Sequence, residues 1–271
     1  MMTGPSRPAP VWRKRTTAAE WLQWLCWAAL AALFVWCWQV MNRNTIWAFA
    51  LDAPSQGAQL VARAFPPRWD YAGQLMGPLW DTINIATLGT LLGAVLSVPV
   101  AFLAASNTTP SAAFLRPLAL LIIVASRSIN SLIWALVLVV IFGPGLLAGI
   151  LAIALRSIGF ISKLIYEAIE EIDEGQVEAV RATGAGTAQL LDYAVVPQVL
   201  PTFMGVTVFR WDINIRESAI LGLVGAGGIG MQLQSSLNML AWSQVSVIFA
   251  LILATVFVSE WVSAKVRHAI L

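Results

Sequence analysis

The chain has 271 residues, a length that suits one or two soluble domains, but 59% of them are hydrophobic and only 11% are charged. A soluble domain carries roughly a quarter of its residues as charged side chains. The mean hydropathy of +0.77 therefore excludes a soluble globule and indicates an integral membrane protein. The net charge of +2 is small, and no basic stripe interleaved with aromatic residues indicates nucleic-acid binding.

The first apolar run, Trp21 to Val40, follows three basic residues and precedes Ala48-Phe49-Ala50, as in a signal peptide. A signal-peptide core has roughly 7–15 residues, which is shorter than this run. Tryptophans near both ends also favour anchoring at the two membrane interfaces. The pattern therefore favours an uncleaved first span over residues 20–41, after a cytoplasmic tail of residues 1–19.

Six apolar stretches are long enough to cross about 30 Å of hydrocarbon as helices. They predict an all-α membrane protein with spans at residues 20–41, 80–105, 115–142, 145–168, 197–221 and 244–264. If the N-terminus is inside, most Lys and Arg residues of the connecting segments fall on the cytoplasmic side. This distribution predicts both termini in the cytoplasm. It also predicts an extracytoplasmic loop, 42–79, and a core, 80–268, that contains a cytoplasmic loop, 169–196.

The cytoplasmic loop is rich in acidic residues, which indicates that it is solvated. Val177, Val180 and residues 182–184 predict a short helix, and Gly184 suits its C-terminal cap. One interpretation of such a helix is an amphipathic connector that lies on the membrane surface.

The spacing within the loop indicates a second interpretation. Glu178-Ala179-Val180 is followed after three residues by Gly184, and nine residues later by Ala194, one residue, and Val196-Pro197. This pattern closely resembles the EAA loop of binding-protein-dependent ABC importer permeases, with conservative replacements at Val180, Ala194 and Val196. In that family the loop forms a coupling helix that docks on a cytoplasmic ATPase. The resemblance implies a type I ABC importer permease fold, with Glu178, Ala179 and Arg181 at the ATPase contact and Gly184 in the turn.

A second motif, Gly225, Gly227, Gly228 and Gly230, satisfies the G-x-G-x-x-G spacing of dinucleotide-binding proteins. That fingerprint joins a strand to a helix and is followed by an acidic residue about 20 positions later. Here the corresponding region, around Phe249 to Leu253, is apolar. The alternative is an extracytoplasmic loop or gate whose glycines allow close approach of the backbone.

With the residues before it, the glycine segment looks like the corresponding part of phosphonate-type ABC permeases. The segments that carry this likeness are 216–230, 180–185, 196–198, 64–67 and 126–130. The likeness covers most of the chain from about residue 60 to 267, and it implies a small phosphorus oxyanion, phosphonate or phosphite, as the transported solute.

Charged residues at bilayer depth need a physical reason, since each costs about 2.5–3.5 kcal/mol at the centre of a span. Arg127, Arg156 and Arg210 fall near the middle of predicted spans. Asp212 and Arg216 are four residues apart and can pair on one helix face. One interpretation is that these charges lock helices together; the other is that surplus arginine contacts an oxyanion. The candidate pathway residues are Arg127, Asn130, Arg156, Arg210, Asp212, Asn214, Arg216 and Glu217.

The sequence predicts a transport subunit rather than an enzyme. The chain has one histidine and two cysteines, and it lacks a G-x-x-x-x-G-K-[ST] nucleotide-binding loop. We therefore expect no metal or cofactor on this chain, with ATP and Mg²⁺ held by a partner. The resemblance implies an ATPase dimer, an extracytoplasmic binding protein and a second permease copy as partners in a bacterial inner membrane. The alternatives are an ABC permease for methionine or a quaternary amine, or an ion-coupled secondary transporter.

Overall fold

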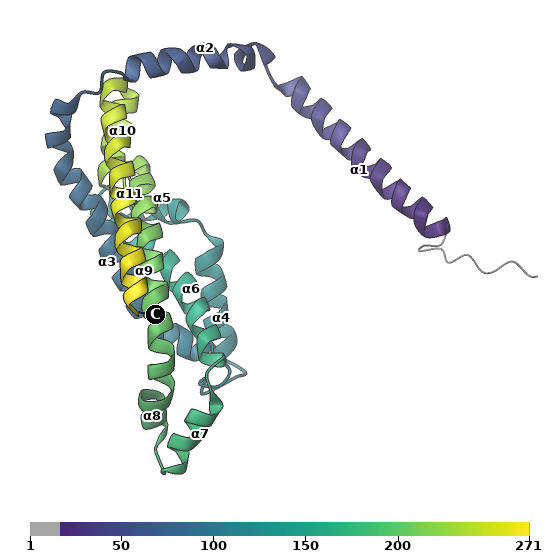
Figure 1. Ribbon diagram of the computed structural model, residues 1–271, viewed down its shortest axis with the longest axis vertical. Coiled ribbons are helices and arrows are strands. Elements are labelled where there is room, and N and C mark those ends of the chain that lie inside the picture. Colours follow the sequence, from purple (N-terminus) through teal and green to yellow (C-terminus); the bar gives the residue numbers. More distant parts are fainter. Residues whose placement is uncertain (1–16, 271) are drawn as a thin grey trace, which may run out of the picture. The chain divides into compact units, whose positions relative to one another are not determined.

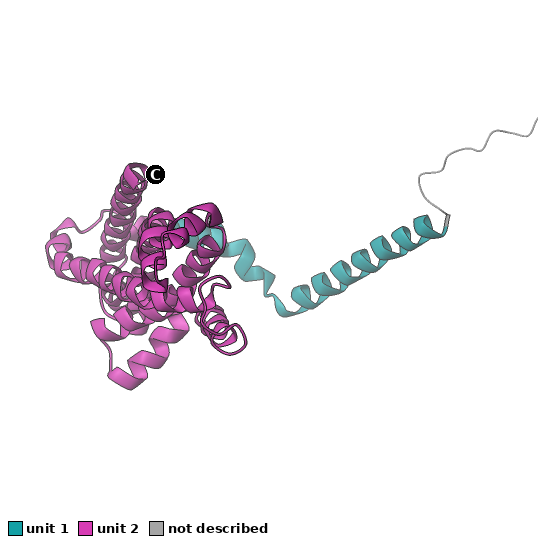
Figure 2. Cartoon of the chain, turned by 90° about the horizontal axis from the view of Figure 1, so that it is seen from below, with its two compact units in different colours: residues 1–59 teal, residues 60–271 magenta. Residues whose placement is uncertain are grey.

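A computed structural model describes residues 17–270, and all regular secondary structure in this range is helical, as predicted. The chain divides into two compact units, Met1–Gln59 and Leu60–Leu271 (Figure 2). Residues 1–16 of the predicted cytoplasmic tail lie outside the described range.

The first unit contains α1 (Thr17–Asn44) and most of α2 (Trp47–Ala64). At 1.5 Å per residue, a helix of 28 residues is about 42 Å long, so α1 is long enough to span a membrane. Cys26 and Cys37 both lie on this helix as free thiols. Helix α2 and the short helix η1 (Trp69–Tyr71) occupy much of the predicted loop 42–79, so this segment is largely helical.

Four long helices form the body of the second unit: α3 (Ala72–Ala104), α6 (Leu146–Glu170), α9 (Val196–Leu221) and α11 (Trp242–Ile270) (Figure 1). Each covers a predicted span. Helices α3 and α6 lie close together because glycines face the contact. A Cβ atom added at Gly93 would lie 2.7 Å from Cβ of Ser157.

The predicted span over 115–142 is not a single straight helix. This segment forms α4 (Leu115–Ser128) and α5 (Ser131–Phe142), and the two helices are bent by 91°. The break occurs because Asn130 adopts extended backbone angles and its side chain accepts a hydrogen bond from the Leu132 N–H at 3.1 Å, which caps α5. Within the described range, five helices can each span a membrane by length and composition, or six if the bent pair is one span.

The segments between α6 and α9 and between α9 and α11 are also structured. The first contains α7 (Glu174–Ala182), α8 (Thr187–Leu190) and the π-helix η2 (Leu191–Val195). The second, predicted as a loop over 222–243, contains η3 (Gly222–Val224) and α10 (Ile229–Asn238). Figure 1 shows α7 and α8 at one end of the helix bundle and α10 near the other end.

Large apolar side chains cover much of the outer surface of the bundle. Val140 on α5 is 85% exposed, and Phe257 on α11 is 77% exposed. Patches of this kind on a soluble monomer mark interfaces, and in a helical bundle of this hydropathy they fit contact with lipid chains.

Candidate functional site

Helix α7 has well-defined caps at both ends. Asp173 precedes the helix and its side chain accepts a hydrogen bond from the Gly175 N–H at 2.9 Å. After Thr183, Gly184 adopts a φ of 82°, and its N–H donates to the Arg181 carbonyl at 3.0 Å. The structure thus contains the predicted short helix, but its C-terminal cap is Thr183 rather than Gly184. Gly184 follows the cap, because glycine takes the left-handed conformation needed there without steric cost.

Side-chain contacts hold both ends of the α6–α9 connection to the bundle. The Asp173 N–H donates to Oε1 of Gln198 on α9 at 2.9 Å. At the end of α6, Glu170 accepts from the Ser106 N–H at 2.7 Å and pairs with Arg116 at 3.2 Å. These contacts tie the residue before α7 to α9, and the end of α6 to α4 and to the loop after α3.

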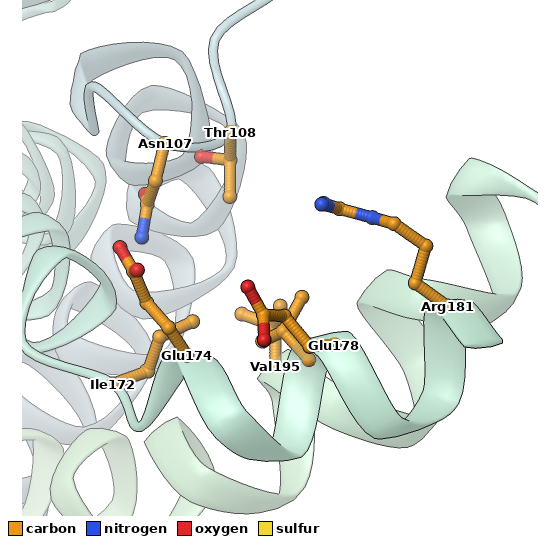
Figure 3. A pocket seen from close by; sticks show the side chains of 8 residues that line it. Asn107, Thr108, Ile172, Glu174, Glu178, Arg181 and Val195 are labelled. Atoms are coloured by element: carbon orange, nitrogen blue, oxygen red, sulfur yellow. The ribbon is translucent and has the colours of Figure 1, made fainter.

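The predicted ATPase-contact residues lie on two sides of α7. Glu178 and Arg181 line a pocket of about 190 Å³ between α7 and the loop that follows α3. Figure 3 shows Glu174 and Glu178 directed toward this pocket, with Asn107 on its far side. Ala179 and Gly184 line a separate open hollow of about 640 Å³, together with Thr183, Gln189 and Tyr193.

A second polar cluster lies inside the helix bundle, centred on Arg210 of α9. Its side chain is only 3% exposed. Its Nε donates to Oγ of Ser157 at 3.2 Å, one Nη lies 3.4 Å from the Glu217 carboxylate, and the guanidinium lies over the Phe160 ring at 5.2 Å. Glu217 also pairs with Arg156 of α6, with 3.7 Å between Nε and Oε1. One carboxylate therefore lies between two guanidinium groups.

Asn214 extends this cluster to α3. It is fully buried, and its Nδ2 donates to Oγ1 of Thr90 at 2.7 Å and to Oγ of Ser157 at 3.0 Å. Its Oδ1 has no hydrogen-bond partner among residues 17–270. Arg210 and Asn214 therefore tie α9 to α6 and α3, and Glu217 on the same helix joins them through Arg210.

Asp212 and Arg216 form a separate pair on another side of α9. Their side chains are 2.6 Å apart, as the four-residue spacing predicts, and Asp212 also accepts from Oγ of Ser259 on α11 at 2.8 Å. Asp212 is buried, while the Arg216 side chain is 43% exposed. This pair connects α9 to α11, away from the pocket described next.

The bend between α4 and α5 borders a pocket of about 390 Å³. Asn130, Arg156 and Glu217 line it, together with Ile220 of α9. Arg127, in the last turn of α4, is exposed and makes no ion pair or hydrogen bond with any residue from 17 to 270. Asn130, Arg156 and Glu217 therefore line one cavity. Arg127 precedes Asn130 by three residues in the chain.

The glycine segment forms a packed turn between α9 and α10. Gly225, Gly227 and Gly228 have φ values of 90°, 90° and 74°. The Gly225 carbonyl accepts from the Gly145 N–H at 3.0 Å, and the Ile229 N–H donates to Oγ1 of Thr82 at 2.8 Å. Because the segment follows a helix, its context differs from the strand that precedes a dinucleotide-binding turn.

Sequence reasoning missed the hydroxyl groups that bond across helices. Ser157 accepts from Arg210 and Ser259 donates to Asp212, while Thr90 accepts from Asn214 and Thr82 and Ser126 accept from backbone N–H groups. Serine and threonine are tolerated in apolar helices, where they bond across helices or to their own backbone, so their positions alone give no signal. Within residues 17–270, no group of three or more His, Cys, Asp or Glu side chains could hold a metal ion.

Residues 97–266 match the family described as binding-protein-dependent transport system inner membrane component. The chain belongs to this family. Members are permease subunits of ABC transporters, so the chain is a multi-pass transport subunit of a bacterial inner membrane rather than an enzyme.

Two relatives show how far the similarity extends. The phosphite transport system permease protein PtxC of Stutzerimonas stutzeri is 39% identical over 233 residues, which cover 85% of this chain and 83% of that protein. The phosphate-import permease protein PhnE of Mycolicibacterium smegmatis is 41% identical over 82% of this chain, which corresponds to 41% of that longer protein.

A solved structure supports the fold. The inward-facing MetNI methionine ABC transporter contains a chain that matches 73% of this one, and the match covers 96% of that chain. The TM-score is 0.63 and the sequence identity is 24%. This likeness confirms the type I ABC permease fold.

Proposed function

We propose that this chain forms the membrane pathway of an ABC importer for a phosphorus oxyanion such as phosphite, a phosphonate or phosphate. The observation that carries the proposal is 39% identity to a phosphite transport permease over 85% of the chain. The relative named as a phosphate-import permease supports the same class of solute.

The charges at predicted bilayer depth suit an anion. Four arginines, at positions 127, 156, 210 and 216, stand against two carboxylates, Asp212 and Glu217. An arginine guanidinium has forked N–H donors that match the oxygens of a phosphate-like group. We infer that Arg127, Asn130 and Arg156 contact the anion during passage. Arg210 holds the Glu217 carboxylate and bonds to Ser157 of α6, and Asn214 also bonds to Ser157.

We propose that α7 is the coupling helix. Glu178, Ala179, Arg181 and Gly184 would meet a cytoplasmic ATPase that binds ATP and Mg²⁺ on its own chain. A capped helix held to α9 through Gln198 and adjoining α6 can transmit a rigid-body rotation to the bundle. When the ATPase pair closes, two such helices from two copies of this chain move together and the pathway changes the side to which it opens.

The proposed topology places residues 1–19 and the loop 169–196 in the cytoplasm and residues 42–79 outside. The outward end of the bundle then contains α10 and the glycine turn, Gly225 to Gly230. We infer that this turn, with the Asp212–Arg216 pair, supports an outer gate that receives the solute from a binding protein. Since a conduit must release its solute, selection rests mainly with that binding protein.

Affinity purification of the chain in mild detergent, followed by mass spectrometry, tests this proposal. We expect an ATPase with a G-x-x-x-x-G-K-[ST] loop and a binding protein to copurify. The binding protein is then titrated with phosphite, methylphosphonate, phosphate, methionine and glycine betaine. Binding of methionine or betaine but of no phosphorus compound would contradict the proposed solute.

A further inference from the structure

We propose that Glu217 is an internal counter-anion: its carboxylate occupies an anion site beside Arg156, and the transported oxyanion takes its place there. This inference rests on the proposed function and assigns a specificity-determining role to Glu217. The ligand class is a small tetrahedral oxyanion with at least two oxygens free to accept hydrogen bonds.

The two contacts of Glu217 are unequal. Oε2 lies 3.4 Å from Nη2 of Arg210, and that hydrogen bond is inside the bundle, where the Arg210 side chain is 3% exposed. Oε1 lies 3.7 Å from Nε of Arg156, which is beyond hydrogen-bond distance. Glu217 is therefore anchored by Arg210, while Arg156 is held only by charge attraction.

Arg156 keeps its donors available. Its side chain is 28% exposed, and it donates no hydrogen bond to any other residue in the range 17–270. Arg156 lines the pocket of about 390 Å³ together with Asn130, which lies at the bend between α4 and α5. Because a water molecule takes about 30 Å³, this volume accommodates a five-atom oxyanion with several waters. The Asn130 side chain caps α5 through its oxygen, which leaves the amide nitrogen free to donate.

An exchange of anions gives both the Glu217 carboxylate and the Arg156 guanidinium a role in transport. In the empty pathway, Glu217 neutralises Arg156, which otherwise would be an unpaired charge at bilayer depth. An entering oxyanion offers the guanidinium two good acceptors in place of one distant carboxylate oxygen. Glu217 then remains with Arg210 and repels the bound anion, which favours its release. A neutral solute cannot replace the carboxylate, so the pocket discriminates by charge.

The test is equilibrium binding of radiolabelled methylphosphonate to the complete importer in lipid nanodiscs, without ATP or binding protein. Glu217→Gln removes the competing charge and keeps the shape and one acceptor oxygen. We expect methylphosphonate to bind this variant at least tenfold more tightly than the wild type, a difference of about 1.4 kcal/mol. The matched control is Glu167→Gln, which removes the same charge from a pair with Lys163 on α6, at 2.7 Å, outside the pocket.

A second pair of variants tests the inference if the Glu217→Gln importer does not assemble. Asn130→Asp adds a carboxylate to the pocket, and Asn130→Ser adds none; aspartate and serine both cap helices about as well as asparagine. We expect the Asn130→Asp importer to bind methylphosphonate at least threefold more weakly than the Asn130→Ser importer.

Three results would overturn the inference: Glu217→Gln binds no more tightly than wild type, Glu167→Gln gains as much affinity as Glu217→Gln, or the two Asn130 variants bind equally. ATP-driven uptake of phosphite, methylphosphonate and phosphate by the wild-type importer is measured separately. Absence of that uptake rejects the proposed function, while the affinity ratios still decide the role of Glu217.

Discussion

Replacement of Arg210 by methionine tests whether the polar cluster holds the bundle together. The substitution preserves an unbranched side chain but removes the guanidinium that contacts Glu217 at 3.4 Å, Ser157 at 3.2 Å and the Phe160 ring at 5.2 Å. Ser157 still accepts from Asn214 at 3.0 Å, so its oxygen keeps a partner. Glu217 keeps only its longer contact with Arg156.

The expected loss of stability follows from these contacts. A hydrogen bond to a charged group contributes about 1.5–3 kcal/mol, and a partly desolvated cation–π contact about 0.5–2 kcal/mol. Because Arg156 still offsets part of the Glu217 charge, we expect a net loss of about 3 kcal/mol, near the lower limit for one-sided removal of a buried pair. For a chain of this size, that corresponds to a fall of about 6–12 °C in melting temperature.

The assay is thermal unfolding of the purified complex in detergent, followed by tryptophan fluorescence. The control is Lys163→Gln, which breaks the Lys163–Glu167 pair, whose side chains are 35% and 39% exposed. An exposed pair contributes less than about 1 kcal/mol, so this control should melt within about 4 °C of the wild type. The double variant Arg210→Met with Glu217→Gln should recover part of the loss. Equal melting of Arg210→Met and Lys163→Gln would refute the structural role of Arg210.

Four further variants test other parts of the account. Glu178→Arg reverses a charge on α7, so ATP-driven uptake should fall at least tenfold although the ATPase still copurifies; unchanged uptake would remove Glu178 from the coupling contact. Gly159→Ala places a Cβ 2.6 Å from Oγ of Ser126 and should cost about 1–3 kcal/mol in thermal unfolding, whereas Gly205→Ala, in open space on α9, should be neutral or stabilising by up to about 1 kcal/mol. Equal melting of the two glycine variants would contradict the close packing of α4 on α6. Arg127→Ala should lower phosphorus-oxyanion uptake while the complex still assembles, and loss of assembly instead would make Arg127 a packing residue.

The length of the apolar stretches predicted the long helices because a membrane span has few alternatives to a helix that satisfies its own backbone. The coupling-loop helix was also predictable, since Gly184 has a local conformational reason to end it. Break points were not predictable in the same way. The residues from Ser126 to Asn130 interrupt an apolar run only briefly, so hydropathy gave no indication of the 91° bend between α4 and α5.

The pairing of the charged residues within the helices was predictable in part. Four-residue spacing gave the Asp212–Arg216 pair, because both side chains lie on one helix face. The pairing of Glu217 with Arg156 was not accessible, since the two residues are on different helices and their contact depends on how α6 packs on α9. For the same reason the hydroxyl partners Thr90, Ser157 and Ser259 carried no signal in the sequence.

The most direct test of the central claim is solute uptake by the importer reconstituted in proteoliposomes with its ATPase and binding protein. We expect radiolabelled phosphite, methylphosphonate or phosphate to accumulate only when ATP and Mg²⁺ are supplied on the ATPase side and the binding protein on the other. ATP-driven accumulation of methionine or glycine betaine, with none of any phosphorus oxyanion, would contradict the claim.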